Sequence, residues 1–394
     1  MNKNFTFHNT LLDSISSKCD VAVWDSVMAA WDNKEYLKSL QLLFDYVDPK
    51  LAEKYANSER TSWQVPHGSV IVQLEITDEL LKVEAPFLKV TDSKRIPLLR
   101  QVAQLNFHPL TITKIDLEDD SLYFRFSCPL ELCEPYKVYD ALREICINAD
   151  QYDDEFIKKF DAKRIQEPKV EHYSQDKKQK AWDYMQLYLS EAEEAFKYFE
   201  ERRLSGFEWD VIMITLMKLE YLIAPQGSLR NEIEKQHAAM SANEDIITKV
   251  QQGKAFLQKL RNMSRDEFDA DLYKIDTLIQ YKFRATLPNV KQNLQGALDQ
   301  AKKEIENKDY IGATLTLEYN FMSMYYFNHV GDEIDAMVRP YLLEASAKPV
   351  AEAADILYRT MEGLITGNVP VQRAAPPQGR TEEKKGFFAK LFGK

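Results

Sequence analysis

The stretch LTITKIDLEDDSLYFRF, residues 110–126, predicts a β-hairpin. Two runs with a period of two flank the acidic turn at 118–121, and in the second run Leu122, Phe124 and Phe126 share one face. Such alternation is typical of antiparallel strands with one buried face. The acidic turn lacks the glycine and the distal glutamate of a twelve-residue calcium loop, so we interpret it as a solvated hairpin tip.

The segments before and after this hairpin alternate between helical and strand periodicity. The predicted elements are a helical hairpin at 23–47, strands at 69–76, 81–83 and 87–90, a helix at 94–107, strands at 110–117 and 122–127, and a helix at 135–160. We therefore expect an α+β N-terminal domain over residues 1–165. Its order would be α-βββ-α-ββ-α, with an antiparallel five-stranded sheet and flanking helices.

This order of elements resembles the fold of the type III secretion chaperones and of the related bacterial YbjN-type proteins. The first helices, the strands at 68–90, the helix at 94–106, the hairpin LTITKIDLEDDSLYFRF and the helix from Pro135 carry the resemblance. It covers about a third of the chain, and the other two thirds depart from it, since such chaperones usually stand alone as small dimers. The resemblance implies a chaperone-like, non-catalytic domain that pairs with itself or with a client polypeptide, and it assigns no active-site residues.

The rest of the chain has helical periodicity. Residues 161–176 are polar, contain Pro168 and show no sustained period, so we expect them to connect two domains. From 176 to 367 apolar residues recur at helical spacing, in runs at 182–199, 211–222, 246–256, 272–279 and 290–305. This pattern predicts an all-α helical bundle domain of about seven helices over 176–367.

Two helix starts resemble each other, NKEYLKSLQLLF from Asn33 and NKDYIGATLTLEYNF from Asn307. Each combines a polar corner, an aromatic residue and an apolar helix start. Two copies so far apart do not form a tandem array, so we interpret them as similar helix corners and draw no functional conclusion.

The charge of the chain is unevenly distributed. Its net charge is −11, but residues 369–394 contain six Lys/Arg against Glu382 and Glu383 and carry +4, which leaves −15 on the body. An acidic body of this size repels phosphate backbones, so we expect no nucleic-acid partner.

Motifs of catalysis and cofactor binding are absent from the sequence. It contains no Gly-x-Ser-x-Gly elbow and no Gly-rich phosphate-binding loop. We therefore expect no enzyme activity, no cofactor and no metal. The four cysteines, Cys19, Cys128, Cys133 and Cys146, are expected to be reduced and mostly buried, because they are too few for a disulfide framework and Cys128 and Cys133 have the wrong gap for a paired metal knuckle.

Glu234 and His237 form a Glu-x-x-His pair, which a helix places on one face. A di-iron bundle needs this pair twice and two further carboxylates, so we interpret the pair as solvated surface residues. A metal-dependent enzyme with a site in the helical bundle is the alternative. The stretch YNFMSMYYFNHV at 319–330 is expected to pack in the core, with a hydrophobic partner groove as the alternative.

The last eleven residues, KKGFFAKLFGK at 384–394, form a basic amphipathic tail behind a flexible linker at 368–383. Four apolar side chains gather on one side of a short helix and four lysines frame them, which suits a membrane surface or a partner groove. One such tail binds weakly after the entropy of ordering, so two tails in a dimer would gain from avidity. The expected contact residues are Lys384, Lys385, Phe387, Phe388, Lys390, Leu391, Phe392 and Lys394.

The sequence shows neither a signal peptide nor a long apolar run, so we expect a cytoplasmic protein, peripheral at the inner membrane face through its tail. We expect a non-enzymatic protein-binding adaptor or chaperone-like protein, recruited to a membrane surface or a larger assembly by the tail. Its partners would be a client protein, weak membrane contact through the tail, and a second copy in a homodimer. A purely structural dimer with an inert tail is a further alternative.

Overall fold

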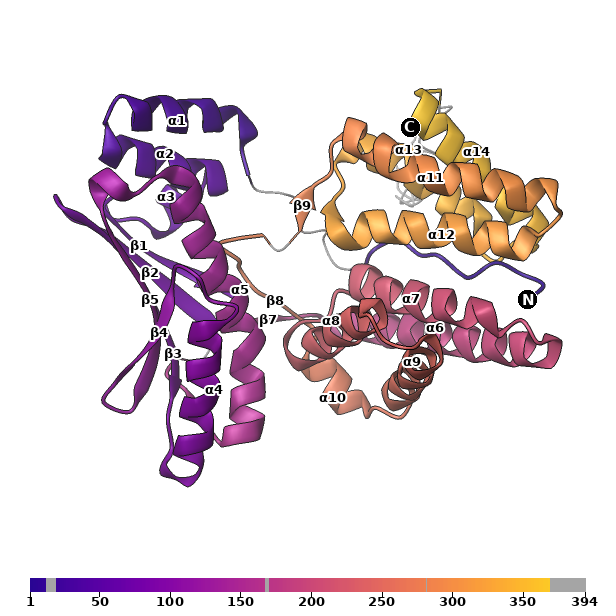
Figure 1. The fold of residues 1–394 in the computed structure, drawn as a ribbon, viewed down its shortest axis with the longest axis horizontal. Helices are drawn as coiled ribbons and strands as arrows, with labels where there is room; N and C mark the ends of the chain where they lie inside the picture. Colours follow the sequence, from indigo (N-terminus) through magenta and orange to yellow (C-terminus); the bar gives the residue numbers. More distant parts are fainter. Residues whose placement is uncertain (12–18, 167–169, 281, 369–394) are drawn as a thin grey trace, which may run out of the picture.

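The computed structural model describes residues 1–11, 19–166, 170–280 and 282–368. Figure 1 shows an α+β part at the left and a helical part at the right. Each part has its own apolar core, one built around the sheet and its covering helices and one built among the helices. An N-terminal antiparallel sheet with flanking helices and a C-terminal helical region are therefore confirmed.

The sheet has the strand order β1-β2-β3-β5-β4, and all of these neighbours pair antiparallel. A two-residue strand, β6, also pairs with β3, so the sheet has six strands where five were expected. The strands are β1 (Ser62–His67), β2 (Val70–Ile76), β3 (Leu80–Lys89), β4 (Lys114–Glu118), β5 (Ser121–Pro129) and β6 (Lys163–Arg164).

Two strand predictions are wrong in detail. The predicted strands at 81–83 and 87–90 are one continuous strand, β3, whose register shifts between Pro86 and Leu88. This irregularity breaks the alternation that marks a strand in the sequence. Strand β1 was not predicted, because it is short and contains Pro66, which a sheet tolerates at an edge.

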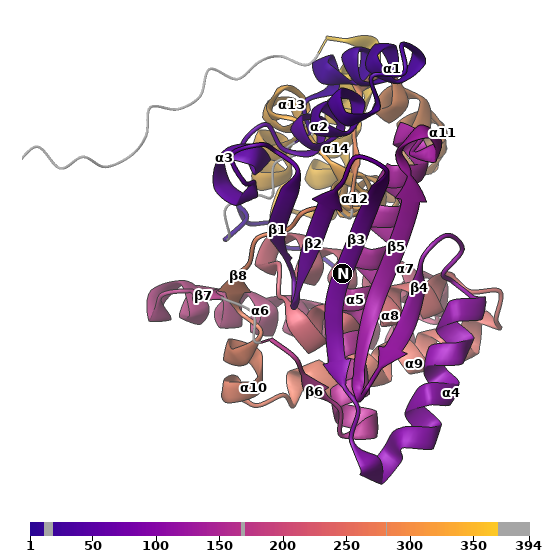
Figure 2. The same ribbon diagram turned by 90° about the vertical axis from the view of Figure 1, so that its left-hand side faces the viewer.

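Helices cover one face of the sheet. They are α1 (Trp24–Asp32), α2 (Tyr36–Val47), α3 (Leu51–Tyr55), α4 (Arg95–Phe107) and α5 (Pro135–Phe160). Figure 2 shows the opposite face toward the viewer. On that face Arg125 Nε lies 2.7 Å from Glu84 and Arg125 Nη2 lies 2.5 Å from Glu118, so cross-strand ion pairs replace apolar packing.

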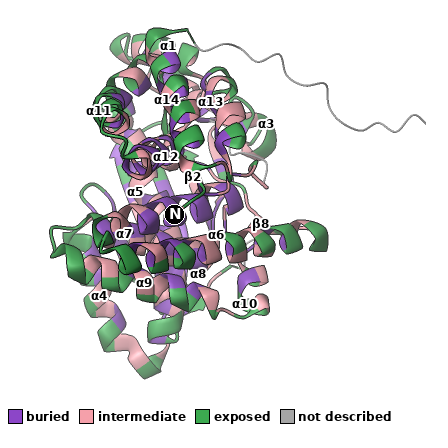
Figure 3. Ribbon diagram, turned by 90° about the vertical axis from the view of Figure 1, so that its right-hand side faces the viewer, coloured by how far each residue is buried: buried purple, intermediate pink, exposed green. Residues whose placement is uncertain are grey.

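The helical part has nine α-helices within the described residues from 175 to 368, more than the seven expected. They are α6 (Gln175–Arg202), α7 (Glu208–Lys218), α8 (Gly227–Ser241), α9 (Ile246–Arg261), α10 (Arg265–Ala270), α11 (Leu287–Glu306), α12 (Tyr310–Phe327), α13 (Asp332–Ala345) and α14 (Val350–Thr366). Figure 3 shows buried and exposed residues on these helices, and α7 lies inside the bundle, since none of its residues is exposed.

Residues 272–279 are not helical, contrary to the prediction. The short strand β8 (Tyr273–Lys274) pairs there with β7 (Glu171–His172), and the chain then runs without regular structure. Leu272 is buried in the helical core, whereas Leu278 and Ile279 are buried in the core of the sheet. The apolar residues between 272 and 279 thus belong to two different cores, and their spacing in the sequence resembles that of a single helix.

One segment from each part of the chain is buried in the core of the other part, so no single position in the sequence separates the two cores. Phe5 and Phe7 are buried in the core of the helical part, although the predicted first domain spans 1–165. In return, residues 275–280 cross to the sheet, where His67 Nδ1 accepts a hydrogen bond of 3.0 Å from the backbone N–H of Leu278. Both crossings tie the two parts together.

The resemblance between the two helix starts corresponds to one turn geometry. Lys34 and Lys308 are both in the left-handed region, with φ of 63° and 60°. Each donates its backbone N–H to the carbonyl of the residue three positions earlier over 2.9 Å. In both cases the next residue donates its N–H to the carbonyl five positions before it. The two stretches therefore form helix corners of the same geometry.

Candidate functional site

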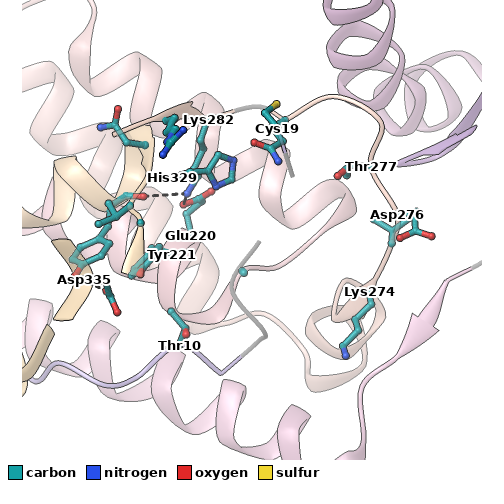
Figure 4. Close-up of a pocket in the computed structure, with 18 of the residues that line it drawn as sticks. Thr10, Cys19, Glu220, Tyr221, Lys274, Asp276, Thr277, Lys282, His329 and Asp335 are labelled. Atoms are coloured by element: carbon teal, nitrogen blue, oxygen red, sulfur yellow. Dashed lines mark hydrogen bonds and ion pairs between the residues drawn. The ribbon is translucent and has the colours of Figure 1, made fainter. Parts of the chain in front are cut away.

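A cavity of about 1110 Å³ lies between the helical part and the helical hairpin of the α+β part, which contributes residues 19–22 and Pro49. Figure 4 shows side chains from both parts around it, with Cys19 and Asp276 on one side and Glu220 and His329 on the other. Thr10, from the N-terminal segment, also lines it. Clefts between two packed units are common places for binding sites, so this cleft is the candidate functional site.

A π-helix forms one wall of the cleft. Helix α7 continues into the π-helix η5 (Leu219–Ile223), which ends at Ala224 with φ of 49°. Pro225 follows and cannot extend the helix. Both π-helical turns and left-handed non-glycine residues are uncommon and occur often at functional sites, so this wall is a structural marker of the site.

The charged side chains of this wall are paired. Glu220 is buried, and its Oε2 lies 3.0 Å from Lys282 Nζ. Lys282 also donates to the backbone carbonyl of Tyr325 over 3.4 Å. Because an ammonium group neutralises the Glu220 carboxylate, this pair can orient a ligand but does not present a free base.

A second polar group continues the wall toward α13. Asp335 accepts a hydrogen bond of 2.8 Å from the Tyr325 hydroxyl and pairs with Arg339 Nε at 2.8 Å. Arg339 also donates to the Tyr221 hydroxyl over 3.1 Å, and the Tyr221 and Tyr325 rings stack. Burial raises the pKa of Tyr221 to about 12, so its hydroxyl keeps its proton at neutral pH. The wall offers hydroxyl groups and aromatic rings rather than a nucleophile.

The cleft continues into a groove that holds residues 1–11, which we call the N-terminal segment. In Figures 1 and 3 the segment runs between α12 on one side and α6 and α7 on the other. Its side chains Phe5 and Phe7 are 5% and 4% exposed. Its backbone is bonded along the groove, from Asn4 N–H to Lys348 O over 2.7 Å and from Leu11 N–H to Leu222 O over 3.1 Å.

Side chains of the groove also bind the backbone of the N-terminal segment. Glu191 accepts hydrogen bonds from the N–H of Thr6 at 3.0 and 3.1 Å and from its hydroxyl group. Lys218 Nζ donates to the Thr6 carbonyl over 3.0 Å. The groove thus recognises the main chain at Thr6 and apolar side chains at Phe5 and Phe7.

A buried ion pair lies beneath the segment. Lys218 Nζ is 2.7 Å from Glu318 Oε1, and the two side chains are 2% and 3% exposed. Burial raises the pKa of Glu318, and the Lys218 ammonium acts in the opposite direction. The Phe5 ring centroid lies 5.0 Å from Lys218 Nζ. The segment therefore shields the pair from water.

Glu234 and His237 do not form a solvated pair, so that prediction is wrong for the histidine. His237 is 5% exposed and stacks on Tyr326 with ring centroids 4.1 Å apart. Burial lowers the pKa of His237 to about 4. Glu234 pairs instead with Arg230 at 2.9 Å. Within the described ranges, no three His, Cys, Asp or Glu side chains are grouped to hold a metal ion.

The stretch 319–330 packs largely as expected. Phe321 and Met322 are fully buried in the helical core, whereas Phe327 is 52% exposed. The predicted tail residues Lys384, Lys385, Phe387, Phe388, Lys390, Leu391, Phe392 and Lys394, and the linker from 369 on, lie outside the described residues.

The residues of the cleft were missed by sequence reasoning, although one signal was present. Lys218 and Glu220 interrupt an otherwise apolar run from 211 to 223. Charged residues in such a run are buried only when paired, so their presence indicates a polar site inside the fold. Of their partners, Glu318 is likewise the only charged residue in the stretch 310–327, whereas Lys282 lies in a polar stretch and shows no such signal.

Comparison of the chain with protein-family models and with curated proteins finds no match. None of the helices in the described part is long and apolar enough to cross a membrane.

Proposed function

We propose that this protein is a polypeptide-binding adaptor of a chaperone-like kind, in which the helical part receives extended peptide segments. The observation that carries the proposal is the N-terminal segment, which lies extended in the groove with two phenylalanine anchors. Main-chain hydrogen bonds combined with alternate side-chain anchors are a recurring mode of peptide recognition.

Burial of Phe5 and of Phe7 each stabilises the bound segment by on the order of 1.5–3 kcal/mol. The entropy lost when the backbone of the segment is ordered opposes this gain. The covalent link to the body supplies an effective concentration in the millimolar range. A partner peptide with the same spacing of anchors therefore competes with the segment of the chain itself.

The second half of the proposal concerns the tail at 384–394, which recruits the adaptor to a membrane surface or a larger assembly. The support is its sequence, with four apolar and four basic residues. Since the body carries −15, an anionic membrane repels it, and recruitment depends on two tails in a dimer or on a protein groove.

The groove is tested by peptide exchange. A protease site is inserted within residues 12–18, the protein is cleaved, and a fluorescent peptide of residues 1–11 is added while fluorescence anisotropy is recorded. The peptide is expected to bind the cleaved protein and to bind the uncleaved protein far more weakly. A peptide with Phe5→Ala should bind about ten- to a hundredfold more weakly, as the lost burial predicts.

Equal binding of the parent and the Phe5→Ala peptides would contradict the proposed recognition. So would a failure of the peptide to bind cleaved protein whose circular dichroism remains native.

The tail is tested by truncation after Gly367. Full-length protein should float with vesicles of phosphatidylcholine and phosphatidylglycerol or should co-purify a partner, and the truncated form should lose this interaction. If truncation changes neither flotation nor co-purification, the recruitment half of the proposal fails while the groove is unaffected.

A further inference from the structure

Two cysteines and a lysine meet at the end of strand β5. Cys128 lies near the end of the strand, a short 3-10 helix (Leu130–Leu132) follows, and Cys133 comes directly after it. The two side chains are 2% and 0% exposed. Lys137, in the first turn of α5, places Nζ 3.1 Å from Cys128 Sγ. Its ammonium group also donates to the Leu132 carbonyl over 3.3 Å.

The two thiols have different surroundings. Cys133 donates toward the backbone carbonyls of Pro129 and Cys128 at 3.3 and 3.5 Å. Burial, and next to it the neighbouring Cys128, raise the pKa of Cys133 to about 12, so Cys133 stays a thiol. Cys128 is the sulfur in contact with the Lys137 ammonium group.

We propose that Cys128 and Cys133 form an oxidisable thiol pair that takes hydrogen peroxide or another small hydroperoxide as its oxidant, with Cys128 as the attacking sulfur and Lys137 as its positioning residue. The position of the pair fits a small oxidant. Lys137, which contacts Cys128 Sγ, is half-buried, and Leu132, whose carbonyl accepts a hydrogen bond from Lys137, is 56% exposed, so the lysine contact lies near the protein surface.

The reaction balances in two steps. The Cys128 sulfur attacks one peroxide oxygen, an S–O bond forms as the O–O bond breaks, and the leaving oxygen takes up the proton of the Cys128 thiol and departs as water. The sulfur is oxidised by two electrons to a sulfenic acid and the peroxide is reduced. The Cys133 sulfur then attacks the Cys128 sulfur, an S–S bond forms as the S–O bond breaks, and the hydroxyl group leaves with the Cys133 proton as a second water.

Cys146 provides an internal comparison. It is also buried, and its pKa is raised by burial, but its neighbours are the Asp150 carboxylate and the backbone of Ile279 rather than a cation. A buried thiol of this kind is inert. The difference between Cys128 and Cys146 is therefore the ammonium group, not the extent of burial.

The test treats reduced full-length protein with hydrogen peroxide at pH 7.5 and follows free thiols with time. Unreduced peptides are then identified by mass spectrometry. The expected product is a peptide pair joined through Cys128 and Cys133, with the loss of two thiols. The Cys133→Ser variant should stop at a sulfenic acid that dimedone traps at Cys128. The Cys146→Ser variant should oxidise at the rate of the parent protein.

Lys137→Gln should slow the oxidation at least about tenfold, whereas Lys137→Arg, which keeps the charge, should retain most of the rate. Circular dichroism of both variants confirms that they fold. Equal rates for the parent and Lys137→Gln would overturn the role of Lys137. A Cys128 thiol that stays reduced in the native protein while urea-unfolded protein oxidises would overturn the proposal as a whole.

Discussion

Replacement of Lys218 by methionine tests the buried ion pair beneath the N-terminal segment. Methionine has a similar length but no charge, so the Glu318 carboxylate loses the ammonium group at 2.7 Å and the Thr6 carbonyl loses its donor. Removal of one partner from a buried pair costs about 3–5 kcal/mol. Because whole domains are stable by only about 5–15 kcal/mol, this is a large part of the stability of the helical part.

The cost in this variant depends on pH with a definite sign. Burial already raises the pKa of Glu318, and loss of Lys218 raises that pKa further. A carboxyl whose folded pKa lies above its unfolded pKa stabilises the fold fully at acid pH, and this contribution is lost as the pH rises through the folded pKa. The deficit of Lys218→Met relative to the parent should therefore be smaller at pH 5 than at pH 7.5.

The assay is urea unfolding followed by far-UV circular dichroism, together with amide hydrogen exchange of residues 1–11. The exchange of the segment should rise in Lys218→Met because Thr6 is no longer held. The Lys218→Met/Glu318→Leu double variant should recover most of the stability, since no charge is left buried.

A matched control is the pair Lys348–Glu352, which has the same separation of 2.7 Å but side chains that are 43% and 50% exposed. Lys348→Met should cost less than about 1 kcal/mol, as exposed pairs do. If both lysine variants lose the same stability, burial is not what makes the Lys218 pair important, and the reasoning is refuted.

Three further predictions concern stability. Burial lowers the pKa of His237 from 6.5 to about 4, so the unfolded state binds the proton first and the fold should lose about 2 kcal/mol between pH 7.5 and pH 5; His237→Phe should flatten this acid slope in urea titrations, and an unchanged slope would contradict the assignment. Gly68→Ala should cost at least about 2 kcal/mol in thermal unfolding, because φ is 53° and the added Cβ would lie 1.8 Å from Asp150 Oδ1, whereas Gly296→Ala, which meets no atom within 4 Å in a helix, should gain about 1 kcal/mol; equal effects of the two would refute this reading. Lys308→Gly should raise stability by about 0.5–1 kcal/mol because it removes a side chain from φ of 60°, and a loss of stability would show that the corner is not strained.

Local patterns made the sheet predictable from the sequence. The 110–126 hairpin is confirmed, with Leu122, Phe124 and Phe126 all buried, although its first strand begins at Lys114 and not at the predicted Leu110. One face of these strands packs on the core, so apolar and polar residues alternate along each strand. This alternation is visible within a short stretch of sequence. Where the register of a strand shifts, as in β3 between Pro86 and Leu88, the alternation is broken. A short stretch of sequence then no longer predicts the strand.

The candidate site was not predictable because it depends on contacts between distant segments. Glu220 and Lys282 are 62 positions apart, and Lys218 and Thr6 are 212 apart. Sequence reasoning also placed Phe5 and Phe7 with the sheet, since chain order suggests no other core. Their burial in the helical part required the fold itself.

The two crossings between the cores differ in the contacts that hold them. Residues 275–280 are held at both ends, by Leu272 in the helical core and by β9 (Phe283–Arg284), which pairs with β10 (Asn328–His329), so they cannot leave the sheet without unfolding part of both cores. The N-terminal segment is held by side-chain burial of Phe5 and Phe7 and by hydrogen bonds to Lys348, Glu191 and Leu222, and it is the segment whose exchange we propose. Because Thr10 lines the cleft and Leu11 is bonded to the π-helix at Leu222, exchange of the segment alters one wall of the cleft. Occupancy of the groove and shape of the cleft are therefore physically coupled.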